Sequence, residues 1–176
     1  MYPCCNNQQQ TKPVTLTFKR SELLYDAANY SFVEGDIMKA DDDHARHQVF
    51  DITEKGNIDR VTRVLNLAHT ECVEMLFPYT KEEIADGQEA LNNEMTAPEE
   101  YLIVLNLPAG FSFTTVRLLQ NLIHEYLVCR VLADWMSITN PSSEDNWERK
   151  FNDLKTKIKT SLVSRTGKVR RKLTPF

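Results

Sequence analysis

The strongest candidate for metal chemistry is a short polar run in the first third of the chain, Asp41-Asp-Asp-His-Ala-Arg-His47. Its two histidines, His44 and His47, are three residues apart and follow three carboxylates, and both side-chain types bind divalent ions. A dedicated metal site usually draws its ligands from separated elements of the fold, whereas these residues are neighbours in sequence. The run therefore indicates a solvated loop, with His44 and His47 as the ligands to check, and we expect no bound metal.

Two other histidines lie in patterns that match catalytic motifs only in part. His124-Glu125 begins like the helix of a zinc protease, but that motif needs a second histidine four residues after the first, and position 128 is valine. His69 and Cys72 are close on a helix, and their apolar surroundings favour a core cysteine beside a boundary histidine. The chain has no glycine-rich phosphate loop and no GxSxG turn. These observations argue against an enzyme, and we expect neither a catalytic residue nor a cofactor.

The distribution of charge is more informative than these motifs. Residues 155–176 contain eight basic and no acidic side chains, whereas the rest of the chain contains 13 basic and 25 acidic ones. A cationic tail on an anionic body can contact the phosphates of nucleic acid or the acidic face of a neighbouring copy, and a solvated tail is the third alternative. The candidate contact residues are Arg165, Lys168, Arg170, Arg171 and Lys172.

A mainly helical fold must position these side chains. Apolar residues recur at helical spacing over four segments, at about 22–33, 58–79, 112–137 and from Pro141 onward. Three short segments have the composition of strands, at 14–18, 48–53 and 101–107. We therefore predict a mainly α fold of four principal helices with a small β-sheet of two to three short strands, in the α+β class.

Composition divides the chain into three parts. Residues 1–20 form an N-terminal arm with a short strand, residues 21–164 a helical domain, and residues 165–176 the basic C-terminal tail. Within the domain, residues 80–100 hold seven acids and one lysine, which predicts an exposed acidic excursion. The sequence shows no secretory signal and no membrane-spanning run, and its four cysteines have neither zinc nor redox spacing. We therefore expect a protein made in a cytosol, with no membrane partner.

The helix expected at 112–137 is unusually apolar. Fifteen of the 25 residues from Phe113 are apolar, and they are spread around most of the helix circumference. Such a helix is enclosed by other elements, which in a small protein can include neighbouring subunits. The candidate core or assembly positions on this helix and the next are Leu119, Ile123, Tyr126, Trp135, Trp147 and Phe151.

The region from about residue 55 to the C-terminus carries a series of motifs in a defined order. They are Tyr101-Leu-Ile-Val-Leu-Asn-Leu-Pro108, His124-Glu-Tyr-Leu-Val128, Leu132-Ala-Asp-Trp135, Thr139-Asn-Pro141, the Trp147 helix with its Lys-x-Lys spacing, and Lys168-Val-Arg-Arg-Lys172. In this series the chain resembles small virion proteins of tailed phages and prophages of gut bacteria, of the head–tail connector (neck or adaptor) type. The resemblance implies assembly of a ring around the portal, through helix faces and extended termini, and it carries over no catalytic residue.

The leading hypothesis is therefore a non-enzymatic structural subunit of the virion, assembled in the bacterial host cytoplasm. The resemblance implies a homo-oligomeric ring whose partners are the portal and the tail or neighbouring neck proteins. The basic tail would then face either packaged DNA or an acidic subunit surface. The alternative hypothesis is a small nucleic-acid-binding protein that uses the basic C-terminal tail as a phosphate clamp.

Overall fold

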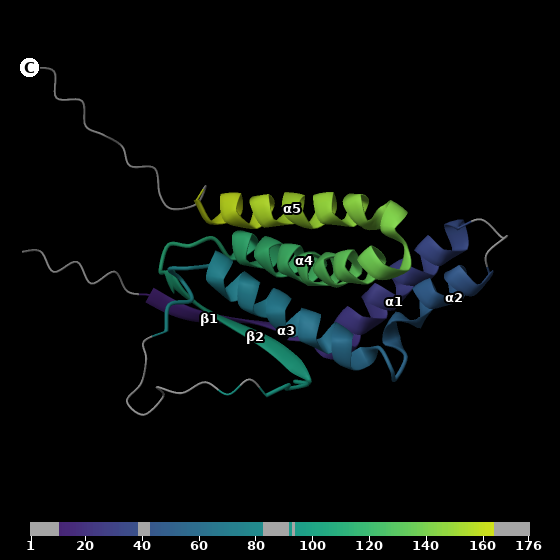
Figure 1. The fold of residues 1–176 in the computed structure, drawn as a ribbon. Helices are drawn as coiled ribbons and strands as arrows, with labels where there is room; N and C mark the ends of the chain where they lie inside the picture. The colour runs from purple at the N-terminus through teal and green to yellow at the C-terminus, as the bar shows by residue number, and fades with distance from the viewer. Residues whose placement is uncertain (1–10, 39–42, 83–91, 93, 164–176) are drawn as a thin grey trace, which may run out of the picture.

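The computed structural model describes residues 11–38, 43–82, 92 and 94–163. In this part of the chain, the elements are β1 (Thr11–Lys19), α1 (Arg20–Ile37), α2 (Asp43–Phe50), the 3-10 turn η1 (Asp51–Thr53), α3 (Ile58–Met75), β2 (Glu100–Pro108), α4 (Phe113–Thr139) and α5 (Pro141–Val163). Five helices and a two-stranded antiparallel sheet make the described part mainly helical (Figure 1). The predicted α+β class is therefore confirmed.

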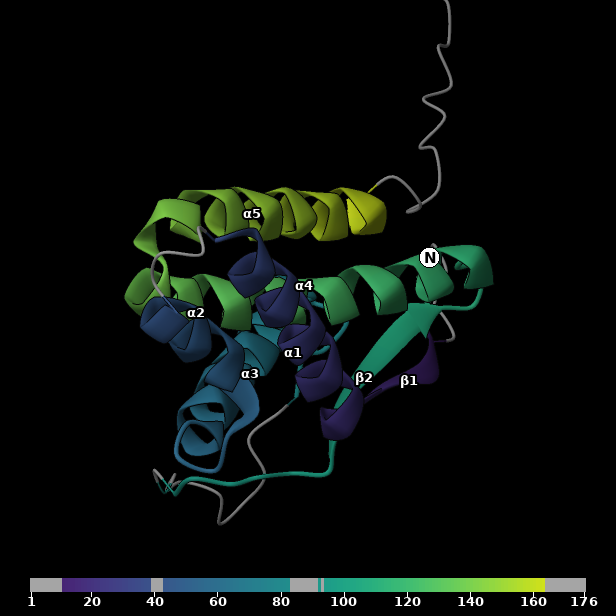
Figure 2. The same cartoon turned by 90° about the vertical axis from the view of Figure 1, so that its right-hand side faces the viewer.

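Helix α4 is the centre of the fold. Helices α1, α3 and α5 pack against it, and the sheet lies beside its N-terminal half (Figures 1 and 2). Thirteen residues of α4 are buried, and they are distributed around the helix rather than along one stripe. The enclosure that the apolar composition predicts is thus supplied by elements of the same chain, without a neighbouring subunit.

The sheet pairs a strand near the N-terminus, β1, with a strand about 80 residues later in the chain, β2. Strands β1 and β2 pair antiparallel along their whole length, from Thr11 opposite Pro108 to Lys19 opposite Glu100. Alternate residues of each strand are buried in the core, as the period of two in a strand requires, and they include Phe18 and Tyr101. The opposite face of the sheet is open, and it exposes Leu102 and Val104.

The register also explains how β1 accommodates a proline. The N–H of Asn106 donates to the carbonyl of Tyr79 at 2.8 Å, so the backbone of this residue points away from β1. Pro13 lies directly opposite Asn106. In an antiparallel pair, two directly opposite residues either both point their N–H and C=O groups toward each other or both point them away. Pro13 therefore also points away from its partner strand, and its lack of an N–H removes no hydrogen bond to β2.

The strand expected at 48–53 is wrong, because this segment forms the end of α2 and the turn η1. The β-branched and aromatic residues Val49, Phe50 and Ile52 favour a strand, but Val49 and Ile52 are three residues apart and are both buried on one side of a helical turn. The carbonyl of Val49 accepts hydrogen bonds from the hydroxyl of Ser31 and from the indole N–H of Trp135, the latter at 3.0 Å. Tertiary contacts thus outweigh the β-propensity of the segment.

Helix α3 buries the predicted apolar seam, but it is shorter than expected. Its residues Val61, Leu65, Ala68 and Cys72 are buried, as the 3-4 spacing requires. The helix ends at Met75, whereas the apolar spacing predicts a helix over 58–79. A proline at position 78 accounts for this end, because its ring would clash inside a continuing helix. Lys81 and Glu82 are not helical.

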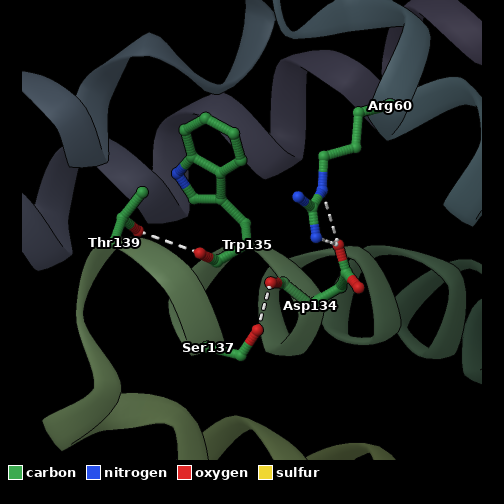
Figure 3. Close-up of polar contacts among 5 residues, drawn as sticks. All are labelled: Arg60, Asp134, Trp135, Ser137 and Thr139. Carbon is green, nitrogen blue, oxygen red and sulfur yellow. Dashed lines mark hydrogen bonds and ion pairs between the residues drawn. The ribbon is translucent and has the colours of Figure 1, made fainter.

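A set of polar contacts fixes the C-terminal end of α4 (Figure 3). Arg60 of α3 donates through Nε and Nη2 to one carboxylate oxygen of Asp134, at 3.2 and 3.0 Å. Thr139 donates to the carbonyl of Trp135 at 3.0 Å, four residues earlier, and Ser137 donates to the carbonyl of Asp134 at 2.7 Å. The Trp-x3-Thr-Asn-Pro motif therefore ends one helix, and Pro141 begins the next at the position where a missing N–H is tolerated.

Candidate functional site

The two metal candidates lie on α2. The side chain of His44 is outside the described residues, whereas His47 is exposed and its ring meets the edge of Phe50 at a centroid distance of 6.1 Å. Among the described residues, no group of three histidine, cysteine or acidic side chains could hold a metal ion. The segment is a helix from Asp43 onward rather than the predicted loop.

The basic tail lies outside the described residues. Its five candidate contact residues, Arg165, Lys168, Arg170, Arg171 and Lys172, all lie outside the described residues, which end with α5 at Val163. The contacts of the tail therefore stay a prediction.

The six candidate core or assembly residues lie inside the subunit. Leu119, Ile123, Tyr126, Trp135 and Trp147 are buried, and Phe151 is half-buried against them. The Tyr126 hydroxyl donates to Glu71 of α3 at 2.6 Å. Burial is the largest cause that raises the pKa of the Tyr126 hydroxyl far above its ordinary value of 10, and the Glu71 carboxylate is the second. The hydroxyl therefore stays neutral and acts as a donor. The five buried side chains join helices of one chain, and Phe151 keeps part of its surface exposed.

A polar cluster that we did not predict lies between α3 and β2. The Tyr101 hydroxyl donates to the side-chain carbonyl of Asn66 at 2.8 Å, and the Asn66 amide donates to the carbonyl of Thr96, also at 2.8 Å. His69 donates through Nε2 to the carbonyl of Leu102 at 3.0 Å, which leaves Nδ1 as an acceptor. These residues border a hollow of about 440 Å³.

The chemistry of this cluster is structural. Burial is the main cause that lowers the pKa of His69 below its ordinary value of 6.5, while its bond to Leu102 acts in the opposite direction. Burial raises the pKa of Tyr101, so its hydroxyl is a poor acid at neutral pH. Both groups donate hydrogen bonds within the chain, His69 to the carbonyl of Leu102 and Tyr101 to the side chain of Asn66. These bonds hold β2 against α3. The signal in the sequence is the spacing of Asn66 and His69, which places them on one side of a helix.

Neither of the described thiols has the surroundings of a nucleophile. Cys72 and Cys129 are buried. Burial raises the pKa of the Cys129 thiol to about 11, and it raises that of Cys72 still further, with Glu71 as the second cause. Because the thiolate is the reactive form, both thiols are inert at neutral pH. The expectation of a core cysteine at position 72 is confirmed.

The outer face of α1 exposes several large apolar side chains. It carries Tyr25, Phe32, Val33 and Ile37, which are exposed by 67%, 61%, 54% and 76%. The inner face of the same helix is made mostly of small residues, with Ala27, Ser31 and Gly35 buried beside Leu23. A soluble helix ordinarily buries its large apolar side chains, so this inversion indicates a contact surface.

Small residues let α1 approach α2 closely. A Cβ atom at Gly35 would overlap the ring of Phe50, so only glycine fits at this position without displacing that ring. Phe50 in turn stacks on Phe32 at a centroid distance of 5.2 Å. On the opposite side, His124 of α4 donates to Asp26 at 2.7 Å. Helix α1 is thus held in place by its inner face, its flanks and the Phe32–Phe50 stack, while Tyr25, Val33 and Ile37 on its outer face stay exposed.

A second surface lies between the N-terminal half of α4 and the C-terminal half of α5. Leu118, Leu122, Thr156, Lys157, Thr160 and Ser161 line a groove of about 330 Å³. Leu118 is half-exposed at this groove, and Leu122 is partly buried. Lys157 and Lys159 are exposed on α5, and Arg117 is exposed on α4 with its guanidinium over the Phe113 ring. The groove therefore has an apolar floor formed by Leu118 and Leu122, with Lys157 as its basic lining residue.

The chain has no match among the protein families, the curated proteins or the solved structures with which it was compared. None of the helices in the described ranges is both long and apolar enough to cross a membrane.

Proposed function

We propose that the protein is a non-enzymatic structural subunit of a tailed-phage particle, a head–tail connector that assembles around the portal. The observation that carries the assembly role is the outer face of α1, where four large apolar side chains are exposed on a helix that buries small ones. Such a face lowers the solubility of a free subunit and gains free energy only when a partner covers it. The assignment to a phage connector rests on the resemblance of residues 55–176.

The polar chemistry of the described residues is consistent with this proposal. His69, Tyr101 and His124 each bind within the subunit, and the two described thiols are buried. Their hydrogen bonds join α3 to β2 and α4 to α1, as expected of groups that stabilise a rigid building block.

Light scattering of the full-length protein tests the proposal. We expect an oligomer much heavier than the 20.4 kDa chain, and ring-shaped particles by electron microscopy. A variant that lacks residues 165–176 should keep the helical circular dichroism of the full chain but form fewer or smaller oligomers. A full-length protein that stays monomeric at every concentration and salt would contradict self-assembly.

A second candidate function, a phosphate clamp on nucleic acid, is favoured by one feature of α5. Its last turns carry Lys155, Lys157 and Lys159 and no acid, and the basic tail follows them directly. Binding to an arbitrary duplex that weakens steeply with salt, in a protein that does not self-associate, would favour this candidate over the first.

A further inference from the structure

We propose that the groove between α4 and α5 receives the outer face of α1 from a second copy of this chain. This inference rests on the proposed assembly function and names the two surfaces that meet. We define the α1 face by Tyr25, Phe32, Val33 and Ile37, and the groove by Leu118, Leu122 and Lys157.

The first argument is the match in shape and polarity. The α1 face projects large apolar side chains from a helix, whereas the groove offers an apolar hollow of about 330 Å³ between two helices. An amphipathic helix that lays its apolar side chains into a groove between helices is a recurrent way of recognising a protein partner. Covering both surfaces at once removes apolar area of each from water.

The second argument is charge. Helix α1 carries four acids, Glu22, Asp26, Glu34 and Asp36, and a single base, Arg20, which donates to Thr62 inside the subunit at 2.8 Å. Glu22 and Asp36 are the exposed acids of the α1 face. Glu22 pairs with the exposed Lys19 at 3.4 Å, and Asp36 pairs with the half-buried Arg46 at 3.4 Å; pairs of carboxylates as exposed as these contribute little.

The groove has the opposite sign. Lys157 lines it, and the C-terminal half of α5 carries Lys155, Lys157 and Lys159 and no acid after Asp153. The acidic α1 face therefore complements the basic groove, and the pairing steers the two surfaces together. The same argument disfavours residues 164–176 of the chain itself as the occupant, because that segment holds five basic residues and no acid.

Two variants, each with one surface altered, test the pairing in the full-length protein. The first is Tyr25→Ser with Ile37→Ser on the α1 face, which leaves the Phe32–Phe50 stack in place. The second is Leu118→Gln with Lys157→Glu in the groove. The control is Leu67→Ser, which removes a similarly exposed apolar side chain from α3. Circular dichroism and thermal unfolding establish that all three fold like the parent.

We expect each altered surface to weaken self-association at least about tenfold in sedimentation or light scattering, and the Leu67 control to have no effect. The decisive measurement is an equimolar mixture of the two variants. One intact α1 face and one intact groove remain in the mixture, so we expect 1:1 dimers that neither variant forms alone.

Several outcomes would overturn the inference. If the parent assembles and the folded variants do not complement each other, the α1 face and the groove are not partners, although the assembly proposal stands. If the groove variant loses duplex binding while its self-association is unchanged, the groove serves nucleic acid. A parent protein that is monomeric throughout would overturn both the inference and the proposed function.

Discussion

Helices α1 and α5 both lie at the outside of the fold, yet they distribute their apolar residues in opposite ways. Helix α5 buries large side chains, Trp147, Leu154, Ile158 and Leu162, and its outer face is polar. Helix α1 buries mainly small ones and exposes four large ones. The difference shows that packing explains α5, whereas Tyr25, Val33 and Ile37 on the outer face of α1 stay more than half exposed in a single copy.

The largest expected effect comes from the inner face of α5. Ile158 is fully buried, so Ile158→Ala should lower the free energy of unfolding by about 2–5 kcal/mol, through lost burial and the cavity left behind. Urea unfolding followed by circular dichroism measures the loss. Thr160→Ala, at an exposed position on the same helix, is the control and should change stability by less than about 0.5 kcal/mol. Equal effects of the two would mean that α5 does not pack as described.

The next effect tests why α1 buries small residues. Gly35→Ala places a methyl group against the Phe50 ring and should destabilise the protein by about 1–3 kcal/mol, more than the gain expected from replacing glycine in a helix. Gly56→Ala is the matched control, because a Cβ there has no atom within 4 Å. A stabilised Gly35→Ala variant in thermal unfolding would show that α1 and α2 are not in close contact.

A smaller effect concerns the basic lining residue of the groove. Lys157→Ala should weaken self-association by roughly two- to fivefold at low salt, because an exposed ion pair contributes about 0.2–1 kcal/mol. The effect should vanish at high salt, where charges are screened. Lys12→Ala, at an exposed position of β1, is the control for net charge. An effect of Lys157→Ala that is independent of salt would contradict charge pairing at the groove.

The smallest effect on stability is expected on the outer face of α1. Ile37 is 76% exposed, so Ile37→Ala, the same substitution as at position 158, should change the free energy of unfolding by less than about 0.5 kcal/mol in dilute protein. Its effect should appear only in the concentration dependence of the oligomer. A loss of stability comparable to that of Ile158→Ala would make the outer face part of the fold and would abolish the contrast between the two helices.

The elements with strong periodicity were predictable from the sequence. The stripe of α5, the seam of α3 up to Cys72 and the strands at 14–18 and 101–107 are confirmed, since each has a clear apolar period. The segment 48–53 was predicted wrongly because its local pattern suits a strand, whereas the carbonyl of Val49 is held by α1 and α4.

The surfaces were harder to predict than the elements. The spacing predicts an inner face of α1 formed by Leu23, Leu24, Ala27, Ala28 and Ser31. The structure buries Leu23, Ala27 and Ser31 and half-buries Leu24 and Ala28. Nothing in the spacing indicates that the large residues on the other side of the helix stay exposed. The groove depends on how α4 and α5 cross, which no local pattern specifies. The polar cluster of Asn66 and Tyr101 joins residues 35 positions apart and needs the fold to bring them together.

The pairing of β1 with β2 has a consequence for how the chain folds as it is made. Roughly 80 residues separate Lys19 from Glu100, and these two residues face each other in the ladder. At a synthesis rate of about 5–20 residues per second, β1 waits roughly 4–16 s after its own synthesis before β2 exists. The helical hairpin of α4 and α5, by contrast, closes through local contacts. We therefore expect Leu16 and Phe18 of β1 to stay exposed at least until β2 has been synthesised.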